Sequence, residues 1–208
     1  MQGWDNLAHQ ITLLAINPKT GRVRRRRGNL ALAVAAGVLA ELALQERVSL
    51  VDKKVLVHDS RPTEDPLLDI MLGILEHQPD RRPARILSDA RNVYMNQALG
   101  DLVSNGWAKM TSTSDLLGAR YQVVDLDHLA RIRDLAAQGL RDPDQAPTRA
   151  VVLGGLASIL SLTAELAPEL GWRQRAAVQG KLAKRDWVVK SVRDVVSARA
   201  AAAASAAS

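Results

Sequence analysis

Four consecutive arginines, Arg24–Arg27, are the residues of this chain with the clearest chemical potential. Gly28 and Asn29 follow them, and an apolar helical pattern starts at Leu30. A helix N-terminus already carries partial positive charge, so four cations beside it are electrostatically unfavourable unless an anion binds there. Guanidinium groups offer a planar fork of donors and keep their charge at every relevant pH, which suits phosphate. The run therefore predicts a phosphate-binding site.

Positive charge is concentrated in two segments of the sequence. Lys19–Arg27 holds six cations and no acid, and Arg173–Arg199 holds eight cations against two acids, so each segment has a net charge of +6. The whole chain has a net charge of only +6, so the remainder is acidic. Such segregation favours an anionic partner, either a nucleic acid backbone or a lipid headgroup. The simpler interpretation, that the arginines keep a loop in water, stays open.

Catalytic and metal-binding motifs are not evident in the sequence. An acidic cluster at residues 59–69 could hold a divalent cation, but Asp65 as a helix cap and Asp69 in the first turn explain it structurally. Glycine-rich phosphate loops and a nucleophile elbow are absent. We therefore expect no enzyme activity, no metal and no cofactor. The histidines occur singly, without metal-ligand spacing: His9, His58, His77 and His128.

Composition and hydropathy limit the cellular setting. The absence of cysteine excludes disulfides and thiolate metal ligands, and it is consistent with an intracellular protein. No segment reaches the roughly 18 consecutive apolar residues that a membrane-spanning helix needs. The absence of phenylalanine, with only four Trp and two Tyr, disfavours single-stranded nucleic acid as a partner. We expect a cytoplasmic protein that is peripherally membrane-associated.

The elements that must position the arginines are mostly helices. Residues 29–45 are predicted to form a helix that is apolar on nearly every face, which is typical of the middle of a bundle. Asn29 is its predicted N-cap. Glu41 is its only charge, and we expect this carboxylate to be paired. Further helices are predicted at Leu7–Ile16, from Pro66 to Leu75, at Ile86–Ser104, Leu126–Leu140 and Ala146–Leu166, and between Trp172 and Ala198 as one helix or a pair.

Two pairs of short segments, each pair with turn residues between its members, predict two β-hairpins. The first pairs Arg47–Val51 with Lys54–His58, and the second pairs Trp107–Met110 with Arg120–Val124. The predicted fold class is therefore mainly α, with a central apolar helical bundle surrounded by amphipathic helices and one or two short β-hairpins. We expect a single domain over residues 4–198 and an Ala/Ser-rich disordered tail over residues 199–208.

Several ordered segments resemble one known family. They are Leu13–Ile16 with the turn Lys19–Gly21, Leu39–Leu44 running into Arg47 and Val48, Arg61–Asp69, Arg91–Val93 and Leu102–Trp107. Their order and spacing are similar to those of the Golgi phosphoprotein 3 family in its bacterial branch. The resemblance covers roughly Leu7 to Val196, and Pro62–Asp69 is its most specific part.

The resemblance implies a mostly helical fold and a role at membranes. Eukaryotic members of the family bind phosphatidylinositol 4-phosphate on Golgi membranes and hold the cytoplasmic tails of glycosyltransferases, and a projecting hairpin supports their oligomerisation. By position, Arg91 matches one of the headgroup arginines. The family's headgroup tryptophan falls near Arg26, and two further headgroup arginines fall near Ala35 and at Tyr94.

Two hypotheses of different classes follow from these observations. The first is a peripheral membrane protein that binds anionic phospholipid headgroups, similar to phosphatidylinositol 4-phosphate, through Arg24, Arg25, Arg26, Arg27 and Arg91. The second is a soluble adaptor without lipid specificity, which binds protein clients or forms a homo-oligomer. Its expected hairpin surface consists of Trp107, Leu116, Leu117 and Tyr121. Nucleic acid binding is the least favoured of the alternatives.

Overall fold

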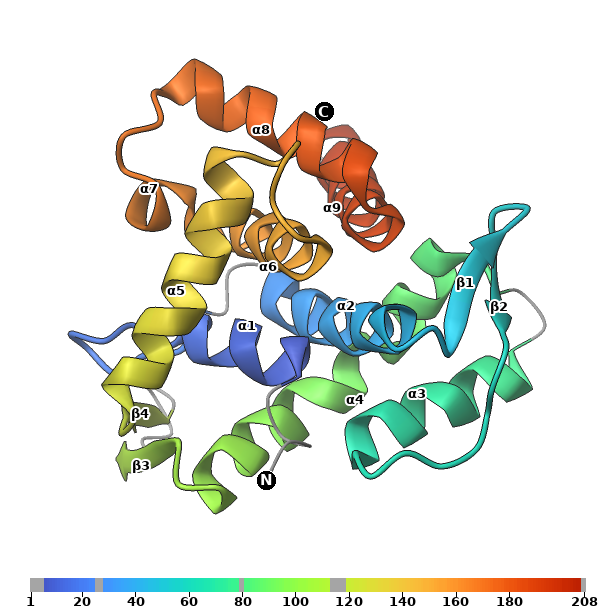
Figure 1. Ribbon diagram of the computed structural model, residues 1–208, viewed down its shortest axis with the longest axis horizontal. Coiled ribbons are helices and arrows are strands. Elements are labelled where there is room, and N and C mark those ends of the chain that lie inside the picture. Colours follow the sequence, from blue (N-terminus) through green and yellow to red (C-terminus); the bar gives the residue numbers. More distant parts are fainter. Residues whose placement is uncertain (1–5, 25–27, 79–80, 113–118, 207–208) are drawn as a thin grey trace.

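Helices account for most of the chain in the computed structural model, which describes residues 6–24, 28–78, 81–112 and 119–206 (Figure 1). The mainly α fold class is confirmed, and both predicted hairpins are present. The helices are α1 (Leu7–Ala15), α2 (Asn29–Leu44), α3 (Pro66–His77), α4 (Pro83–Ser104), α5 (Leu126–Arg141), α6 (Thr148–Ile159), α7 (Thr163–Leu166), α8 (Trp172–Arg185) and α9 (Trp187–Ser205). The strands are β1 (Val48–Val51), β2 (Lys54–Val57), β3 (Ala108–Ser112) and β4 (Arg120–Val123).

Helix α2 lies at the centre of the fold, as its apolar sequence predicts. It packs against α1, α3, α4, α6 and α9. Figure 1 shows it crossing the middle of the molecule between α6 above and α4 below. Residues on every side of the helix are buried, from Leu30 to Leu42. Each fully buried leucine or valine contributes about 1.5–3 kcal/mol, so α2 supplies a large share of the stabilising energy of the core.

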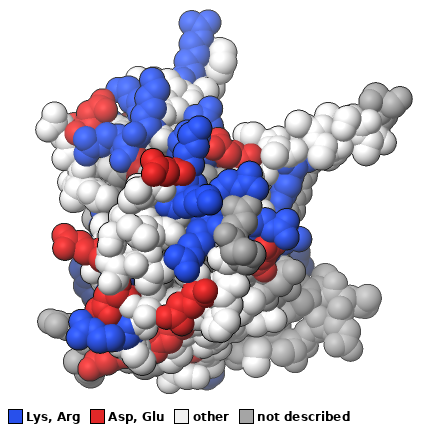
Figure 2. Space-filling model, turned by 90° about the vertical axis from the view of Figure 1, so that its right-hand side faces the viewer, with Lys and Arg blue, Asp and Glu red and all other residues white. Residues whose placement is uncertain are grey.

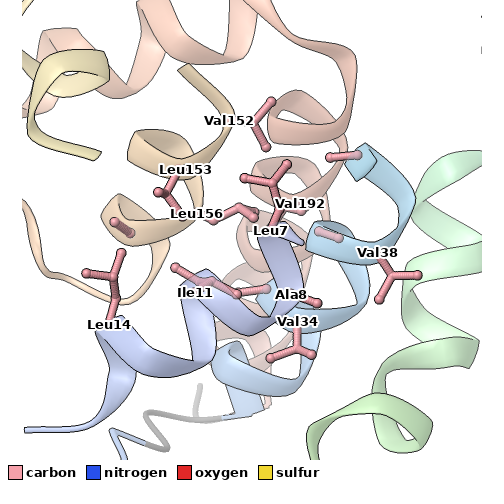
Figure 3. Close-up of a cluster of buried hydrophobic side chains, with 14 of the residues drawn as sticks. Leu7, Ala8, Ile11, Leu14, Val34, Val38, Val152, Leu153, Leu156 and Val192 are labelled. Carbon is pink, nitrogen blue, oxygen red and sulfur yellow. The ribbon is translucent and has the colours of Figure 1, made fainter. Parts of the chain in front are cut away.

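The core joins helices that are distant in the sequence. Figure 3 shows side chains of α1, α2, α6 and α9 meeting in one cluster. Ile11, Leu156 and Val192 contribute from three of these helices, and all three are fully buried. Because the C-terminal helix α9 shares this core, its polar face has a fixed position relative to the start of α2.

The two hairpins have the geometry that their sequences predict. Strands β1 and β2 are antiparallel, and the turn residues Asp52 and Lys53 have φ angles of 49° and 62°. Two consecutive positive φ angles are typical of the type I′ turn that matches the twist of a two-residue hairpin. Strands β3 and β4 are also antiparallel, with an irregularity in the ladder between Met110 and Ser112.

Glycines allow close packing between α5 and α6. A Cβ atom at Gly154 would lie 2.9 Å from the Ala136 carbonyl oxygen of α5, so only glycine fits there without a shift. The contact is closer still at Gly139 of α5, where a Cβ atom would lie 2.0 Å from the Ala150 carbonyl oxygen of α6. Backbone therefore packs directly on backbone between α5 and α6.

The prediction that the Glu41 carboxylate is paired is confirmed. Glu41 Oε1 lies 2.6 Å from Arg149 Nη2 of α6. Its other oxygen, Oε2, accepts a hydrogen bond from the Leu7 N–H at the start of α1, at 3.0 Å. The carboxylate thus satisfies one of the free N–H groups of a buried helix end. It connects α1, α2 and α6 at the centre of the protein.

We predict that Glu41→Gln lowers the free energy of unfolding by about 2 kcal/mol, because the Arg149 guanidinium and the Leu7 N–H lose their negatively charged acceptor in a buried site. Urea unfolding followed by circular dichroism measures the change. Asp144→Asn is the matched control, since Asp144 pairs with Lys181 and both side chains are more than half exposed. An effect of the control as large as that of Glu41→Gln would contradict the role assigned to Glu41.

The prediction of one continuous helix over Ala146–Leu166 is wrong. The structure has α6 ending at Ile159, a turn, and the short helix α7. Ser161 in this turn has a φ of 63°, and the Leu162 N–H donates to the Ala157 carbonyl at 3.0 Å. The turn lets Leu160 and Leu162 both enter the core, and this tertiary gain outweighs the local preference for one helix.

The bounds of α2 and α9 also differ from those predicted. Gly28, with a φ of 73°, occupies the position before the first residue of α2, so Asn29 is the first helical residue rather than the cap. Helix α9 continues to Ser205, although an Ala/Ser-rich disordered tail was expected from residue 199. Alanine has the highest helix propensity of all residues, which explains why the helix extends beyond its last buried residue, Val195.

Candidate anion-binding site

Arg24 begins the arginine run, and it lies where the chain returns after α1. The turn at residues 17–21 folds the chain back, so the Arg24 N–H donates a hydrogen bond to the Ala15 carbonyl at 2.9 Å. The guanidinium Nη2 of Arg24 lies 2.5 Å from Glu165 Oε2 in α7. Glu165 Oε1 also accepts a hydrogen bond from Arg133 Nη1 of α5, at 2.8 Å. One carboxylate is therefore shared by two guanidinium groups.

The cleft around Arg24 keeps an excess of positive charge. It has a volume of about 430 Å³, and Lys19 lines it together with Arg24, Arg133 and Glu165. Burial acts to raise the pKa of Glu165, but the two arginines outweigh burial and lower the pKa below its usual value. Glu165 is therefore ionised at neutral pH. Three cations face this one anion, so the cleft attracts further negative charge.

We predict that the Glu165→Gln variant is less sensitive to acid than the parent protein. Because the pKa of Glu165 is lowered by folding, its ionisation stabilises the fold above the ordinary glutamate pKa of 4.5. This stabilisation disappears as the pH falls through the lowered pKa. Urea midpoints of the two proteins are measured at neutral pH and at several pH values below 4.5. The difference between the two midpoints should be largest at neutral pH and should disappear as the pH falls. A stability difference that is constant with pH would contradict the prediction.

A larger cavity lies at the start of α2, where the arginine run leads into the helix. Arg25–Arg27 lie outside the described residues, and the description resumes at Gly28. Asn29, the first residue of α2, lines a cavity with a volume of about 640 Å³. Its other walls come from the end of α6 and from α8 and α9. The start of α2 therefore lies at this cavity.

Arg91 lies close to the same cavity through its neighbour Arg199. Arg91 is a partly buried residue of α4, and Arg199 is a residue of α9 that lines the cavity. Burial lowers the pKa of Arg199, and repulsion by the Arg91 charge lowers it further. Two of the predicted site residues thus have different neighbours. Arg91 lies near Arg199, whereas Arg24 contacts Glu165 of α7.

Two positions at which the resemblance implies headgroup arginines lie in the core. Ala35 of α2 and Tyr94 of α4 have no exposed surface. Burial also raises the pKa of the Tyr94 hydroxyl, so this group stays neutral. A charged side chain at either position would need a buried counter-ion. A headgroup site in this protein must therefore use other residues.

The described residues of the predicted oligomerisation hairpin pack against the protein itself. Tyr121 is buried, and Trp107 is a partly buried residue packed on the core. The Trp107 ring lies 5.7 Å from the ring of His128. Leu116 and Leu117 lie outside the described residues. Among the residues of this hairpin and its flanks that the structure describes, Met110, Val124 and Leu126 are large apolar side chains that are exposed.

The acidic cluster at residues 59–69 serves the local structure. Asp65 Oδ1 accepts a hydrogen bond from the Leu67 N–H at 2.9 Å and caps α3, as predicted. Asp69, in the first turn of α3, accepts hydrogen bonds from the backbone and side chain of Thr63. A hydrogen bond from Arg61 holds the pKa of Asp59 well below its usual range. The structural interpretation of Asp65 and Asp69 is confirmed.

Sequence reasoning did not single out Arg133 and Glu165 of the cleft around Arg24, nor two arginines of the larger cavity. Arg193 and Arg199 of α9 line the cavity at the start of α2. Trp172, the first residue of α8, is 74% exposed, and Arg173 Cζ lies 5.1 Å from the centre of its ring. The basic segment Arg173–Arg199 was the available signal. Which of its cations face a cavity depends on how α8 and α9 pack.

Surface charge is unevenly distributed on the face that lies at the right of Figure 1. Figure 2 shows Lys and Arg gathered across the upper and central part of this face, whereas Asp and Glu are more frequent at its lower left. Such a distribution steers and orients an anionic partner.

Fold and site together define a mainly helical protein with two small hairpins, a basic cleft around Arg24 and an arginine-lined cavity at the start of its central helix. A family model described as Golgi phosphoprotein 3 (GPP34) matches residues 7–199, and the chain belongs to this family. The family resemblance seen in the sequence is therefore confirmed. A comparison with curated proteins found no match. No helix within the described ranges is both long and apolar enough to cross a bilayer.

Proposed function

We propose that this protein is a peripheral membrane protein of the cytoplasm that binds anionic phospholipid headgroups, with phosphatidylinositol 4-phosphate as the leading candidate. The observation on which the proposal rests is the excess of guanidinium groups around the start of α2. Arg24 shares one carboxylate with Arg133, and Arg91 repels Arg199. Arg25–Arg27 add three cations directly before the helix. Membership of the Golgi phosphoprotein 3 family supports a membrane partner.

The start of α2 supports an anion as the ligand. Gly28 has no side chain with which to cap the helix, and the first turn contains no acidic residue. The first N–H groups of a helix have no intrahelical acceptor, and the helix dipole makes this end positive. A phosphate group satisfies both the free N–H groups and the charge.

An exposed tryptophan supports a membrane surface as the source of that phosphate. Trp172 is 74% exposed at the start of α8. Tryptophan is enriched where a membrane meets water, because its ring is apolar and its N–H is polar. Gln179 lies seven residues further along α8 and lines the cavity. Residues seven apart share a helix face, so the indole and the cavity are on the same side of α8.

Flotation with vesicles tests the proposal. Vesicles of phosphatidylcholine alone are compared with vesicles that also contain phosphatidylserine or phosphatidylinositol 4-phosphate, at low and high salt. We expect binding only to the anionic vesicles and weaker binding at high salt, because the Debye length is about 10 Å at 0.1 M salt. Equal binding to neutral and anionic vesicles, or no binding to either, would refute the proposal.

Arg91→Ala locates the binding surface in the same assay. Each cation near an anionic membrane contributes about 1 kcal/mol, which corresponds to about fivefold weaker binding when it is lost. Arg141→Ala is the matched control, because Arg141 pairs with Glu169 and lines neither of the two cavities. A loss for Arg141→Ala equal to that for Arg91→Ala would mean that net charge alone decides binding.

The second candidate function, a soluble adaptor that binds protein clients or oligomerises, is favoured by the exposed apolar side chains beside the β3–β4 hairpin. Met110, Val124 and Leu126 are 48%, 58% and 63% exposed. Neighbouring exposed apolar side chains are a feature of interaction surfaces. Light scattering over a range of protein concentrations tests this function, and a mass that stays that of a monomer would argue against self-association.

A further inference from the structure

The cleft around Arg24 is bordered by a turn that is fixed to the second hairpin. Asn17 Oδ1 accepts a hydrogen bond from the Lys19 N–H at 2.9 Å and holds the turn in shape. The Tyr121 N–H of β4 donates to the Gly21 carbonyl at 2.8 Å, which ties the turn to the hairpin. The turn that carries Lys19 is therefore preformed, and little chain has to become ordered when a ligand binds beside it.

Arg24 has donor capacity in this cleft that the protein itself does not use. Its Nη2 atom lies 2.5 Å from the Glu165 carboxylate, but its Nε atom is buried and has no hydrogen-bond partner among the described residues. Arginine binds a carboxylate most strongly through two parallel N–H groups, and the pair with Glu165 uses one. A buried guanidinium nitrogen without an acceptor is costly. A carboxylate that contacts both nitrogens removes this cost.

Glu165 indicates which chemical group the cleft accepts. Its two carboxylate oxygens lie 2.5 Å from Arg24 Nη2 and 2.8 Å from Arg133 Nη1. Lys19 lines the same cleft, and no other acid is found in the lining that the structure describes. The Glu165 side chain is 32% exposed and belongs to the four-residue helix α7. An external carboxylate can therefore exchange with it, and the three cations still exceed one negative charge.

An exposed apolar surface lies on the same face of α5 as the cleft. Leu126, the first residue of α5, is 63% exposed, and Arg133 follows it by seven residues, so the two share a helix face. At 1.5 Å per residue they are about 10 Å apart along the helix. Figure 1 shows α5 leading from the β3–β4 hairpin toward α7. A ligand that contacts both places must be elongated, with an acid and an apolar group about 10 Å apart.

We propose that this surface binds an acidic segment of a partner protein, whose carboxylate takes the place of Glu165 between Arg24 and Arg133. An apolar side chain of the same segment packs on Leu126. The spacing corresponds to about three residues of an extended peptide. The inference rests on the second candidate function, the binding of protein clients, and names the chemistry of the client. The cleft is separate from the cavity at the start of α2, since no described residue lines both.

Selection from a random peptide library displayed on phage, with the full-length protein as bait, tests the proposed chemistry. We expect the enriched peptides to share an acidic residue about three positions from a large apolar residue. Replacing this acid by its amide in a fluorescein-labelled enriched peptide should weaken binding about tenfold, because the contact is a charge-assisted one. Fluorescence polarisation measures the affinity. Acidic residues enriched without a fixed spacing would overturn the proposal.

Variants of the protein locate the bound peptide. Arg133→Gln should weaken peptide binding about tenfold. Arg141→Gln is its control, because Arg141 pairs with Glu169 and does not line the cleft. Glu165→Gln should tighten binding about fivefold more than Glu169→Gln, which removes the same charge outside the cleft. A gain of affinity cannot arise from partial unfolding. Equal effects of the cleft variants and their controls would overturn the inference.

The remaining outcomes distinguish this inference from the proposed functions. Enrichment of apolar peptides without an acid would overturn the inference and leave client binding intact, whereas enrichment of no peptide would count against both. If Arg133→Gln weakens flotation with phosphatidylserine vesicles and leaves peptide binding unchanged, the cleft serves the membrane and the inference is overturned. If the parent protein binds the peptide but no vesicle, the membrane function fails and the inference stands.

Discussion

Replacing Arg24–Arg27 by glutamine should weaken binding to anionic vesicles by about three orders of magnitude. Each cation near an anionic surface contributes about 1 kcal/mol, so four contribute about 4 kcal/mol in total. The loss should be largest at low salt and should shrink as salt screens the remaining charges. Flotation or surface plasmon resonance on phosphatidylserine vesicles at two salt concentrations measures it.

Two further variants make this result interpretable. The triple variant of Arg25–Arg27 alone keeps the contact between Arg24 and Glu165, so it separates membrane binding from the stability of the fold. A control triple variant at Lys53, Lys54 and Arg61 removes as much charge from exposed residues elsewhere. Unchanged binding after loss of the arginine run, or an equal loss in the control, would overturn the assignment of the run to the membrane-binding surface.

The Gly139→Ala substitution should lower the free energy of unfolding by about 3 kcal/mol or more. The added Cβ atom would lie 2.0 Å from the Ala150 carbonyl oxygen and 2.5 Å from its carbon, so α5 and α6 must separate. Overpacking typically costs about 1–3 kcal/mol where side chains can adjust, but here the obstacle is backbone. Since domains are stable by only about 5–15 kcal/mol, we expect poor expression or a greatly lowered Tm.

Gly100→Ala is the matched control for this substitution. Gly100 lies inside α4, and no atom lies within 4 Å of the position of an added Cβ atom. Alanine there should raise the stability by about 1 kcal/mol, because it has a higher helix propensity than glycine. Thermal unfolding of the two variants should therefore show shifts of opposite sign. A Gly139→Ala protein as stable as the parent would contradict the close packing of α5 on α6.

Much of the fold could be predicted because local sequence and tertiary packing agree. The apolar stretch of α2 has no polar face, so it had to lie in the interior. Asp65 as the N-cap and Pro66 as the first helical residue specify the start of α3 by local sequence alone. The break between α6 and α7 could not be predicted, because it depends on Leu160 and Leu162 both finding room in the core. Only the packed structure contains that information.

The candidate site could be predicted in part for a similar reason. A run of four arginines is visible in the sequence, and so is the second basic segment. The proximity of Arg91 and Arg199 depends on how α9 crosses α4, which no local pattern specifies. The contact of Arg24 with Glu165 likewise joins residues 141 positions apart in the chain. Burial at Ala35 and Tyr94 also required the structure.

If the protein binds anionic headgroups as proposed, the Glu165 carboxylate competes with them for Arg24. In the free protein this carboxylate forms ion pairs with Arg24 and Arg133, and its lowered pKa keeps it charged. A headgroup binds Arg24 only by displacing this carboxylate. On a sparsely charged membrane the net free energy of binding is therefore small. On a densely charged membrane the net free energy of binding is much larger, because several phosphates bind the protein at the same time. Binding should therefore rise steeply above a threshold of surface charge density instead of increasing in proportion to it.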